Sequence, residues 1–352
     1  MTTVATPTDP TWSEEFATLS LVTRDDPLGT WYATEPYLSD GMVGEPDPGS
    51  TLTWNANPNQ DFGGSAGAMN PFTVGPVTDS AGSPATGDSA LTILCRTYTA
   101  AQRAAVGAYN GSTPGNRWGG TLISNHKVRT FTYGYFEFRA CFPTAGHGMW
   151  PALWFFAAFD GNGSDRGAAE IDLLEIFGPA SGTPWYSSLH ELASGGSPAP
   201  GFNGSVNGFY VGHDDTSRWH AYGLDWQEDA LTFYVDRKRV ARKRGVDARF
   251  YQGVKMAIRM DYTMTKDGAG PGSGPEDAST PDPLMMCVDY IRMWPSFAAA
   301  RLPGRTPQRR PIPFLRRGRS SEPTPALTTR HSRRQPTVPG AVSGGRRNRA
   351  DE

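Results

Sequence analysis

Short apolar runs separated by turn-forming residues recur along the chain and predict an all-β protein. Strand-like runs occupy positions 90–94, 136–139 and 231–235, and clusters of Gly, Pro and Asn lie between such runs. This spacing is typical of a β-sandwich rather than of strands that alternate with helices. Helical periodicity is sparse, and no internal repeat stands out. We therefore expect a fold built from many short strands.

One strand-like run carries an unusual load of negative charge. Glu170, Asp172 and Glu175 lie within the six-residue string EIDLLE, whose other members are Ile and Leu. Side chains alternate faces along a strand, so Glu170 and Asp172 share a face and Glu175 would point the opposite way. A β-bulge that adds one residue at 173–174 returns Glu175 to the face of Glu170. We predict this bulge, with three acids lining one cleft.

Carboxyl groups in this arrangement suit glycoside hydrolysis. A retaining glycosidase needs a nucleophile and an acid that later acts as base, about 5 Å apart. A calcium site or a solvated edge strand is the structural alternative. Hard-cation loops usually place Gly and polar residues between their acids, whereas Ile and Leu separate them here. The pattern therefore favours catalysis.

Aromatic residues precede the acid run at strand spacing. Trp150, Ala152, Trp154 and Phe156 have the same parity and would share one face, and the loop at 160–165 can reverse the chain into the acid strand. Flat indole faces pack well against sugar rings, although tryptophan is also a common core residue. We predict Trp150 and Trp154 as substrate contacts, and the further candidates are Trp118 and Trp185.

These motifs together resemble glycoside hydrolase family 16, the laminarinase-like β-glucanases. The EIDLLE string is similar to the bulged ExDxxE subgroup of that family, and the resemblance extends over residues 12–295. It is carried also by neighbouring strand motifs, which are GMWPALW at 148–154, YGYFEFR at 133–139, WHAYGLDW at 219–226, FYVD at 233–236 and VDYIRMW at 288–294.

The resemblance implies a β-jelly-roll sandwich of two curved antiparallel sheets, of the concanavalin A-like type. It implies that Glu170 is the nucleophile, Asp172 its helper and Glu175 the acid/base. His190 resembles a family histidine that approaches the acids. No cofactor is required, but a structural Ca²⁺ held by Glu15 and Asp289 is an open alternative to two surface acids.

Composition changes abruptly near residue 296. Residues 296–352 contain 13 Arg, no Lys and 3 acids, a net charge of +10, so with a whole-chain charge of −2 the preceding part carries −12. Such a Pro- and Arg-rich segment has few large apolar residues and cannot bury enough surface to fold. We expect a flexible N-terminus at 1–11, one catalytic domain at 12–295 and a disordered tail at 296–352, which could contact anionic polymers.

Cysteine usage and the chain start bear on the compartment. Three cysteines, Cys95, Cys141 and Cys287, lie in or beside apolar runs, which predicts buried free thiols. Residues 1–7 show no basic segment followed by an apolar stretch, and no segment approaches a membrane span. A polysaccharide substrate would nevertheless place the protein outside the cell or in its envelope, so the localisation stays open.

The sequence predicts a monomeric retaining endo-hydrolase of β-1,3- or mixed β-1,3/1,4-glucan. Within enzymes, the alternatives are an exopolysaccharide depolymerase or a transglycosylase of the same fold. A lectin-like binder without turnover is the alternative from another class, because binding needs the sheet but not the three acids. A third hypothesis, nucleic-acid binding through the basic tail, would show as steeply salt-dependent affinity.

Overall fold

The computed structural model describes residues 9–34, 45–46, 53–110, 118–125, 127–157, 168–178, 184–192, 206–265 and 276–300. The chain divides into two units, residues 1–306 and 307–352, and the second lies wholly outside the described residues. Residues 1–8 of the predicted flexible N-terminus, and the predicted tail from 301 onward, also lie outside them. None of the described helices combines the length and apolar character needed to cross a membrane.

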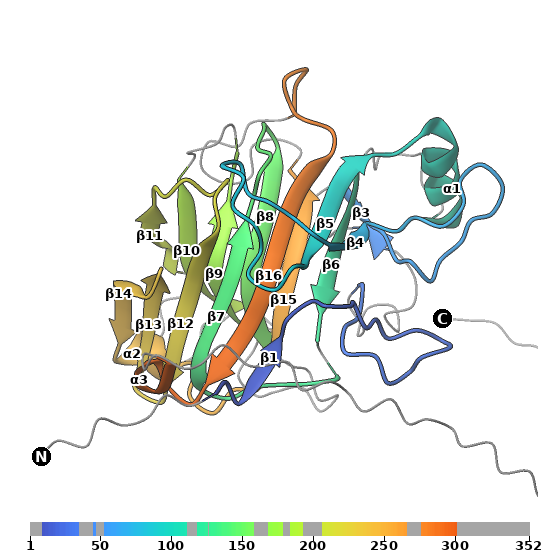
Figure 1. The fold of residues 1–352 in the computed structure, drawn as a ribbon. Helices are drawn as coiled ribbons and strands as arrows, with labels where there is room; N and C mark the ends of the chain where they lie inside the picture. Colours follow the sequence, from blue (N-terminus) through green and yellow to red (C-terminus); the bar gives the residue numbers. More distant parts are fainter. Residues whose placement is uncertain are drawn as a thin grey trace, which may run out of the picture. The chain divides into compact units, whose positions relative to one another are not determined.

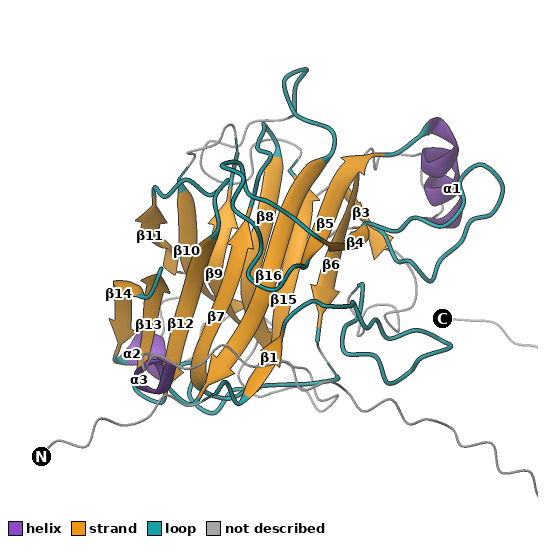
Figure 2. Ribbon diagram, in the orientation of Figure 1, coloured by secondary structure: helices purple, strands orange, loops and turns teal. Residues whose placement is uncertain are grey.

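Two largely antiparallel sheets form the body of the protein (Figures 1 and 2), which confirms the predicted all-β sandwich. The first sheet has the order β11-β10-β9-β8-β15-β6. Its strands are β11 (Val206–Gly212), β10 (Trp185–Leu192), β9 (Ala168–Ile176), β8 (Met149–Ala157), β15 (Met256–Met264) and β6 (Trp118–Ser124).

The second sheet has the order β5-β16-β7-β12-β13-β14, and β4 and β1 pair with β5 and β16. A short β5–β6 pairing joins the two sheets at one edge. The strands are β5 (Ala90–Thr97), β16 (Leu284–Trp294), β7 (Gly134–Cys141), β12 (His220–Gln227), β13 (Ala230–Val235), β14 (Lys238–Arg244), β4 (Phe72–Gly75) and β1 (Trp12–Glu14).

An aromatic core between the sheets fixes which face each strand presents. Phe136 and Phe138 of β7 contact Phe155 of β8, with ring centroids 5.0 and 5.8 Å apart. All three rings are buried, and burying a side chain of this kind contributes about 1.5–3 kcal/mol. Because Phe155 points into the core, its neighbours Trp154 and Phe156 must point to the other face of the first sheet.

The remaining elements are small. β2 (Glu45–Pro46) pairs with β3 (Thr53–Asn55), and β3 runs parallel to β6. The helices among the described residues are α1 (Ala100–Asn110), α2 (Val246–Arg249) and α3 (Phe297–Ala300). The predicted free thiols Cys95, Cys141 and Cys287 are confirmed as buried and unbridged.

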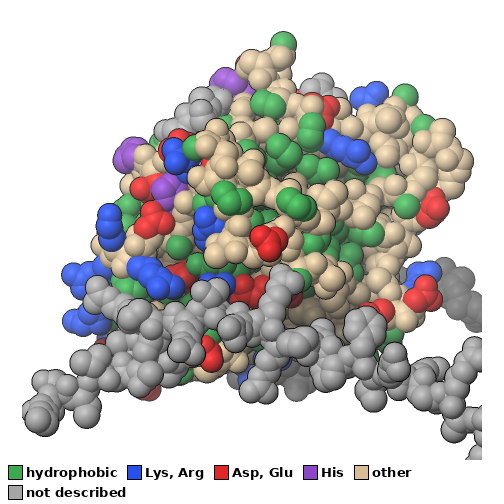
Figure 3. Space-filling model, viewed as in Figure 1, with side chains coloured by type: hydrophobic (Ala, Val, Ile, Leu, Met, Phe, Trp, Pro, Cys, Tyr) green, Lys and Arg blue, Asp and Glu red, His purple; other side chains and the backbone are tan. Residues whose placement is uncertain are grey.

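The edge strand β14 is strongly basic. Its sequence KRVARKR places five cationic side chains in seven residues, and basic side chains gather at this edge of the visible face (Figure 3). An edge strand exposes unpaired backbone groups that could recruit another strand, and charged side chains discourage such pairing. The strand therefore protects the edge of the second sheet.

Both predicted domain boundaries need correction. Phe297 of α3 is buried. Its ring centroid lies 3.9 Å from that of Tyr234, on which it stacks, and 5.0 Å from that of Tyr135. At the other end, the backbone N–H of Thr11 donates to the carbonyl of Met293 at 2.8 Å. The folded domain therefore extends beyond residue 296 and already includes Thr11. The sequence could not predict the burial of Phe297, because a single apolar residue after Pro295 forms no periodic pattern.

These contacts predict where the chain can be shortened. A chain that ends at residue 301 should keep the melting temperature of the full chain, whereas one that ends at Pro295 should lose the stacking of Phe297 on Tyr234. Phe297→Ala should cost about 2–4 kcal/mol, slightly below the usual range for a buried Phe because Phe297 packs at the rim of the domain. Thermal unfolding of the full chain, the two truncations and Phe297→Ala tests this, and equal stability of both truncations would contradict it.

Candidate active site

A β-bulge in β9 puts the three acids on one face, as the sequence predicts. On β8, the adjacent residues Leu153 and Trp154 pair with Leu174 and Asp172, so Leu173 is an extra residue in β9. The pairing of β9 with β10 shifts at the same place. The hydroxyl of Ser187 donates to the carbonyl of Leu173 at 2.8 Å, which satisfies a backbone group that the bulge displaces.

The register of the neighbouring strands arranges the site in three rows across β15, β8, β9 and β10. The row of each acid is read directly from the strand pairing. The rows are Asp261, Ala152, Glu175 and Tyr186; then Arg259, Trp154, Asp172 and Ser188; then Ala257, Phe156, Glu170 and His190. The acids thus lie between an aromatic strand and a polar strand.

Glu175 accepts a hydrogen bond on each carboxyl oxygen. The indole N–H of Trp150 donates to Oε1 at 3.2 Å, and the hydroxyl of Ser188 donates to Oε2 at 3.1 Å. Ser188 in turn accepts from the backbone N–H of Gly208 at 3.2 Å. These contacts hold the carboxyl group of Glu175 in one orientation. The hydrogen bond from Trp150 also confirms the predicted proximity of this residue to the acids.

His190 lies next to Asp172 and Glu170. Its Nε2 is 2.9 Å from Oδ2 of Asp172, within ion-pair distance, and it stands opposite Glu170 in the strand register. The hydroxyl of Tyr251 donates to the backbone carbonyls of Glu170 and His190 at 3.1 and 3.2 Å. Tyr251 follows α2 and ties β9 to β10 at the acid cluster, a contact that no motif in the sequence announces.

Burial raises the pKa of all three carboxyl groups. The pKa of Glu170 stands well above its ordinary value, because desolvation and then the charge of Asp172 oppose ionisation, while His190 acts in the opposite direction. Desolvation followed by the charge of Glu175 raises the pKa of Asp172. Desolvation also raises that of Glu175, partly offset by Ser188, His190 and Trp150. The cluster therefore retains protons at a pH where isolated carboxyls would have lost them.

Two residues of β15 complete the polar surroundings of Trp154. The indole N–H of Trp154 donates to Oδ1 of Asp261 at 2.7 Å. The guanidinium of Arg259 lies over the rings of Trp154 and Phe156, at 4.8 and 4.2 Å from their centroids. Trp154 therefore faces the acid side of the sheet as predicted. Asp261 and Arg259 escaped the sequence prediction because they lie in a run without a recognisable acid motif.

The other two predicted tryptophan contacts are wrong. Trp185 opens β10 and is 1% exposed, because its neighbour Tyr186 takes the acid face opposite Glu175 and Trp185 must point into the core. Trp118 is 2% exposed, and its indole N–H donates to Glu276. Both positions looked like loops in the sequence, but both begin strands, so their indoles are core residues.

The residues predicted to hold calcium are engaged by arginines. Glu15 accepts two hydrogen bonds from Arg292, at 2.9 and 2.8 Å. Asp289 accepts from Arg139 and from the hydroxyl of Thr86. Among the described residues, the one group of possible metal ligands is Glu170, Asp172 and His190, with donor atoms within 4.8 Å of one another. Within that group, Nε2 of His190 lies at ion-pair distance from Oδ2 of Asp172.

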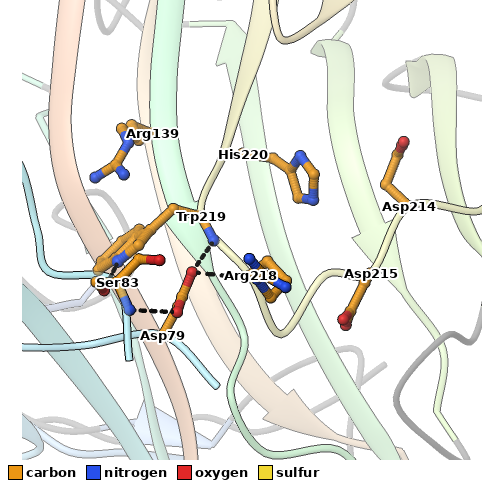
Figure 4. A pocket seen from close by; sticks show the side chains of 8 residues that line it. All are labelled: Asp79, Ser83, Arg139, Asp214, Asp215, Arg218, Trp219 and His220. Carbon is orange, nitrogen blue, oxygen red and sulfur yellow. Dashed lines mark hydrogen bonds and ion pairs between the residues drawn. The ribbon is translucent and has the colours of Figure 1, made fainter. Parts of the chain in front are cut away.

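A cavity of about 370 Å³ lies at the second sheet, beside β7 and β12 (Figure 4). Several charged side chains that line the cavity pair with neighbouring protein groups. Asp79 accepts from the backbone of Trp219 and pairs with Arg218 at 3.5 Å, and His220 pairs with Asp236 at 2.8 Å. These contacts indicate a structural junction between the 79–83 turn and the segment that enters β12.

Comparisons with known proteins agree with this geometry. The family model described as Glycosyl hydrolases family 16 matches residues 93–273. The endo-1,3-1,4-beta-glycanase ExsH of Rhizobium meliloti is 27% identical over 293 residues, which cover 81% of this chain and 51% of the relative. The chain thus spans about half the length of that relative.

Two further similarities concern a second curated protein and a solved structure. Glucan endo-1,3-beta-glucosidase A1 of Niallia circulans is 27% identical over 183 residues, covering 49% of this chain and 26% of that protein. The laminarinase catalytic domain of Thermotoga maritima superposes with a TM-score of 0.54 at 20% identity, covering 81% of this chain and 97% of that one. The structural match establishes the laminarinase-type jelly-roll fold.

The raised pKa values predict how stability depends on pH. A carboxyl group whose pKa is higher in the folded than in the unfolded protein destabilises the fold as pH rises above the unfolded value, which is 4.5 for Glu170. Glu170→Gln should therefore melt close to the parent at pH 4 and about 2–4 °C above it at pH 7, equivalent to about 1 kcal/mol. Exposed Asp229→Asn is the control. A lower melting temperature for Glu170→Gln at pH 7 would contradict the assignment.

Proposed function

Since the chain belongs to glycosyl hydrolase family 16, we propose that it is a retaining endo-hydrolase of β-1,3- or mixed β-1,3/1,4-glucan. One observation carries the proposal: the bulge at Leu173 brings Glu170, Asp172 and Glu175 onto one face, beside Trp150 and Trp154. The relatives named endo-1,3-1,4-beta-glycanase and glucan endo-1,3-beta-glucosidase support this substrate class.

The reaction proceeds by double displacement. Glu175, whose pKa is raised by burial, acts in its protonated form and gives its proton to the glycosidic oxygen as the bond to the anomeric carbon breaks. The carboxylate of Glu170 attacks that carbon and forms a glycosyl-enzyme ester. Glu175, now ionised, removes a proton from water, the water oxygen attacks the anomeric carbon, and the ester bond to Glu170 breaks.

Electrostatic interactions give the acids different protonation states and therefore different roles. Glu170 must be ionised to attack while Glu175 holds a proton, and negative charge on Glu170 helps Glu175 to keep it. Asp172 is buried between them and its pKa is raised well above the ordinary value, so it can hold a proton and hydrogen-bond to Glu170. His190 favours the ionised form of Glu170. Once the ester forms, the charge on Glu170 disappears and Glu175 ionises more readily.

Aromatic residues of β8 supply the sugar platform. Trp150 and Trp154 are each partly exposed on the acid face, and each indole N–H is bound to a carboxylate, Glu175 or Asp261. Indole rings held in this way present an apolar surface to the C–H groups of a pyranose ring. The glucan chain would thus cross β8 and β9 with one glycosidic bond between Glu170 and Glu175.

A reducing-sugar assay on a glucan panel tests the proposal. The chain should release oligosaccharides from laminarin or from mixed-linkage β-glucan, and Glu170→Gln and Glu175→Gln should each lower turnover by about 10³-fold or more. Asp172→Asn should lose less, since Asp172 forms no covalent bond. Exposed Asp229→Asn is the matched control. Glucan binding without any release of reducing ends would identify a lectin-like binder, and release only from an acidic polymer would identify an exopolysaccharide depolymerase.

The stereochemistry of the product is a separate prediction. The bulge puts Glu175 on the same face as Glu170. If their carboxyl groups lie about 5 Å apart, the gap is too short for a water and the anomeric configuration should be retained. Proton NMR of fresh product should show the β-anomer first, with the α-anomer appearing later by mutarotation. An α-anomer at the earliest time points would mean inversion, and Glu175 could not then be the acid/base placed here.

A further inference from the structure

Asp261 and Arg259 of β15 face the acid side of the first sheet, yet neither has a role in the bond-breaking steps. Both are buried, with exposures of 7% and 2%. Their placement carries an electrostatic cost, because Asp261 adds a fourth carboxylate to a region that already holds three and its charge raises the pKa of Asp172 further. A small neutral residue at this position would avoid that cost, so the carboxylate calls for an explanation.

Both residues contact the same aromatic ring. Oδ1 of Asp261 accepts from the indole N–H of Trp154 at 2.7 Å, which fixes the rotation of the ring in its plane. The guanidinium of Arg259 lies 4.8 Å from the centroid of Trp154 and 4.2 Å from that of Phe156, so it fills the space beside the indole. An arginine over an indole face contributes about 0.5–2 kcal/mol. The indole is therefore held through its edge and through its ring.

We propose that Asp261 and Arg259 are positioning residues that fix the indole of Trp154 as the sugar platform beside the acids. The role in substrate binding rests on the proposed glucan hydrolysis. A sugar that stacks on a ring already held in place does not have to immobilise that ring on binding, and preorganisation of this kind raises affinity. Trp154 pairs with Asp172 in the strand register, so the sugar that it orients lies next to the reacting bond.

Arg259 also lies near Glu170, because its guanidinium is 4.2 Å from the ring centroid of Phe156, which pairs with Glu170 in the strand register. Its charge accordingly lowers the pKa of Glu170. The other charged groups that act on Glu170 are Asp172 and Glu175 on its own strand and His190 on β10, while β8 contributes only aromatic and small side chains at this point. Asp172 and Glu175 raise the pKa and His190 lowers it. Removing the charge of Arg259 should therefore make Glu170 harder to ionise.

The indole N–H of Trp154 gives a test that needs no substrate. In protein labelled with ¹⁵N-tryptophan, the Trp154 indole signal is the one that Trp154→Phe removes. Asp261→Leu should speed its hydrogen exchange by about tenfold or more, since it removes the acceptor, whereas Asp261→Asn, which keeps a carbonyl oxygen, should restore most of the protection. Equal exchange in the parent and in a folded Asp261→Leu protein would overturn the proposal.

A double-mutant cycle measures the effect on glucan. Affinity for a β-1,3-glucan and a mixed-linkage tetrasaccharide is measured by calorimetry in the inactive Glu170→Gln background. Asp261→Leu should weaken binding by about tenfold, yet add little once Trp154→Phe has removed the donor, because residues in contact couple. Additive losses would mean that Asp261 acts elsewhere, and would overturn the proposal. If neither tetrasaccharide binds while the indole exchange responds to Asp261, the positioning of Trp154 stands and the proposed function fails.

The pH profile separates the charge of Arg259 from its packing. Glu170 must be ionised to attack, so Arg259→Met should move the acidic limb of kcat/KM to higher pH, by about half a pH unit or more for a change of about 0.7 kcal/mol. Arg259→Lys keeps the charge and should return the limb towards that of the parent. Melting temperatures confirm that both variants fold. An unmoved limb in Arg259→Met, with only a general loss of activity, would reduce Arg259 to a packing residue and overturn its part of the proposal.

Discussion

The site depends on one extra residue in one strand. Without the bulge, strict alternation along the same residues would turn Glu175 into the core, beside the position of Leu153, where an ionised carboxylate costs several kcal/mol. The bulge instead sends Leu173 and Leu174 into the core in succession and returns Glu175 to the cleft. Two buried leucines stabilise the irregularity, and the hydroxyl of Ser187 binds the displaced carbonyl. The geometry of the acids thus follows from the packing of their apolar neighbours.

Burial of the acids is costly for stability and useful for chemistry for the same reason. A desolvated cluster of three carboxyls keeps its protons to a higher pH than exposed carboxyls do, so one member can serve as an acid where exposed carboxyls would be ionised. Hydrogen bonds from Ser188 and Trp150 and the proximity of His190 moderate this effect at Glu175. The balance between desolvation and these polar contacts decides which acid holds a proton, and every partner comes from a strand next to β9.

The sequence was informative where the pattern is local and silent where tertiary contacts decide. In the run from Glu170 to Glu175, regular alternation would put Glu175 on the opposite face from the other two acids. The bulge could therefore be predicted from these six residues alone. Trp185 could not be placed, because a shift of one residue exchanges the core face for the cleft and the start of β10 has no clear alternation. The same holds for Phe297, whose burial depends on Tyr135 and Tyr234, distant in sequence.

The three rows across the first sheet also separate functions by strand. The acids come from β9, the aromatic platform from β8, and the buried charges that adjust both come from β15. If Asp261 and Arg259 act as proposed, a substitution at either changes the orientation of Trp154 or the ionisation of Glu170, whereas the spacing of the acids is set by β9 and its bulge. Spacing fixes the stereochemical outcome, whereas orientation and ionisation fix affinity and the working pH.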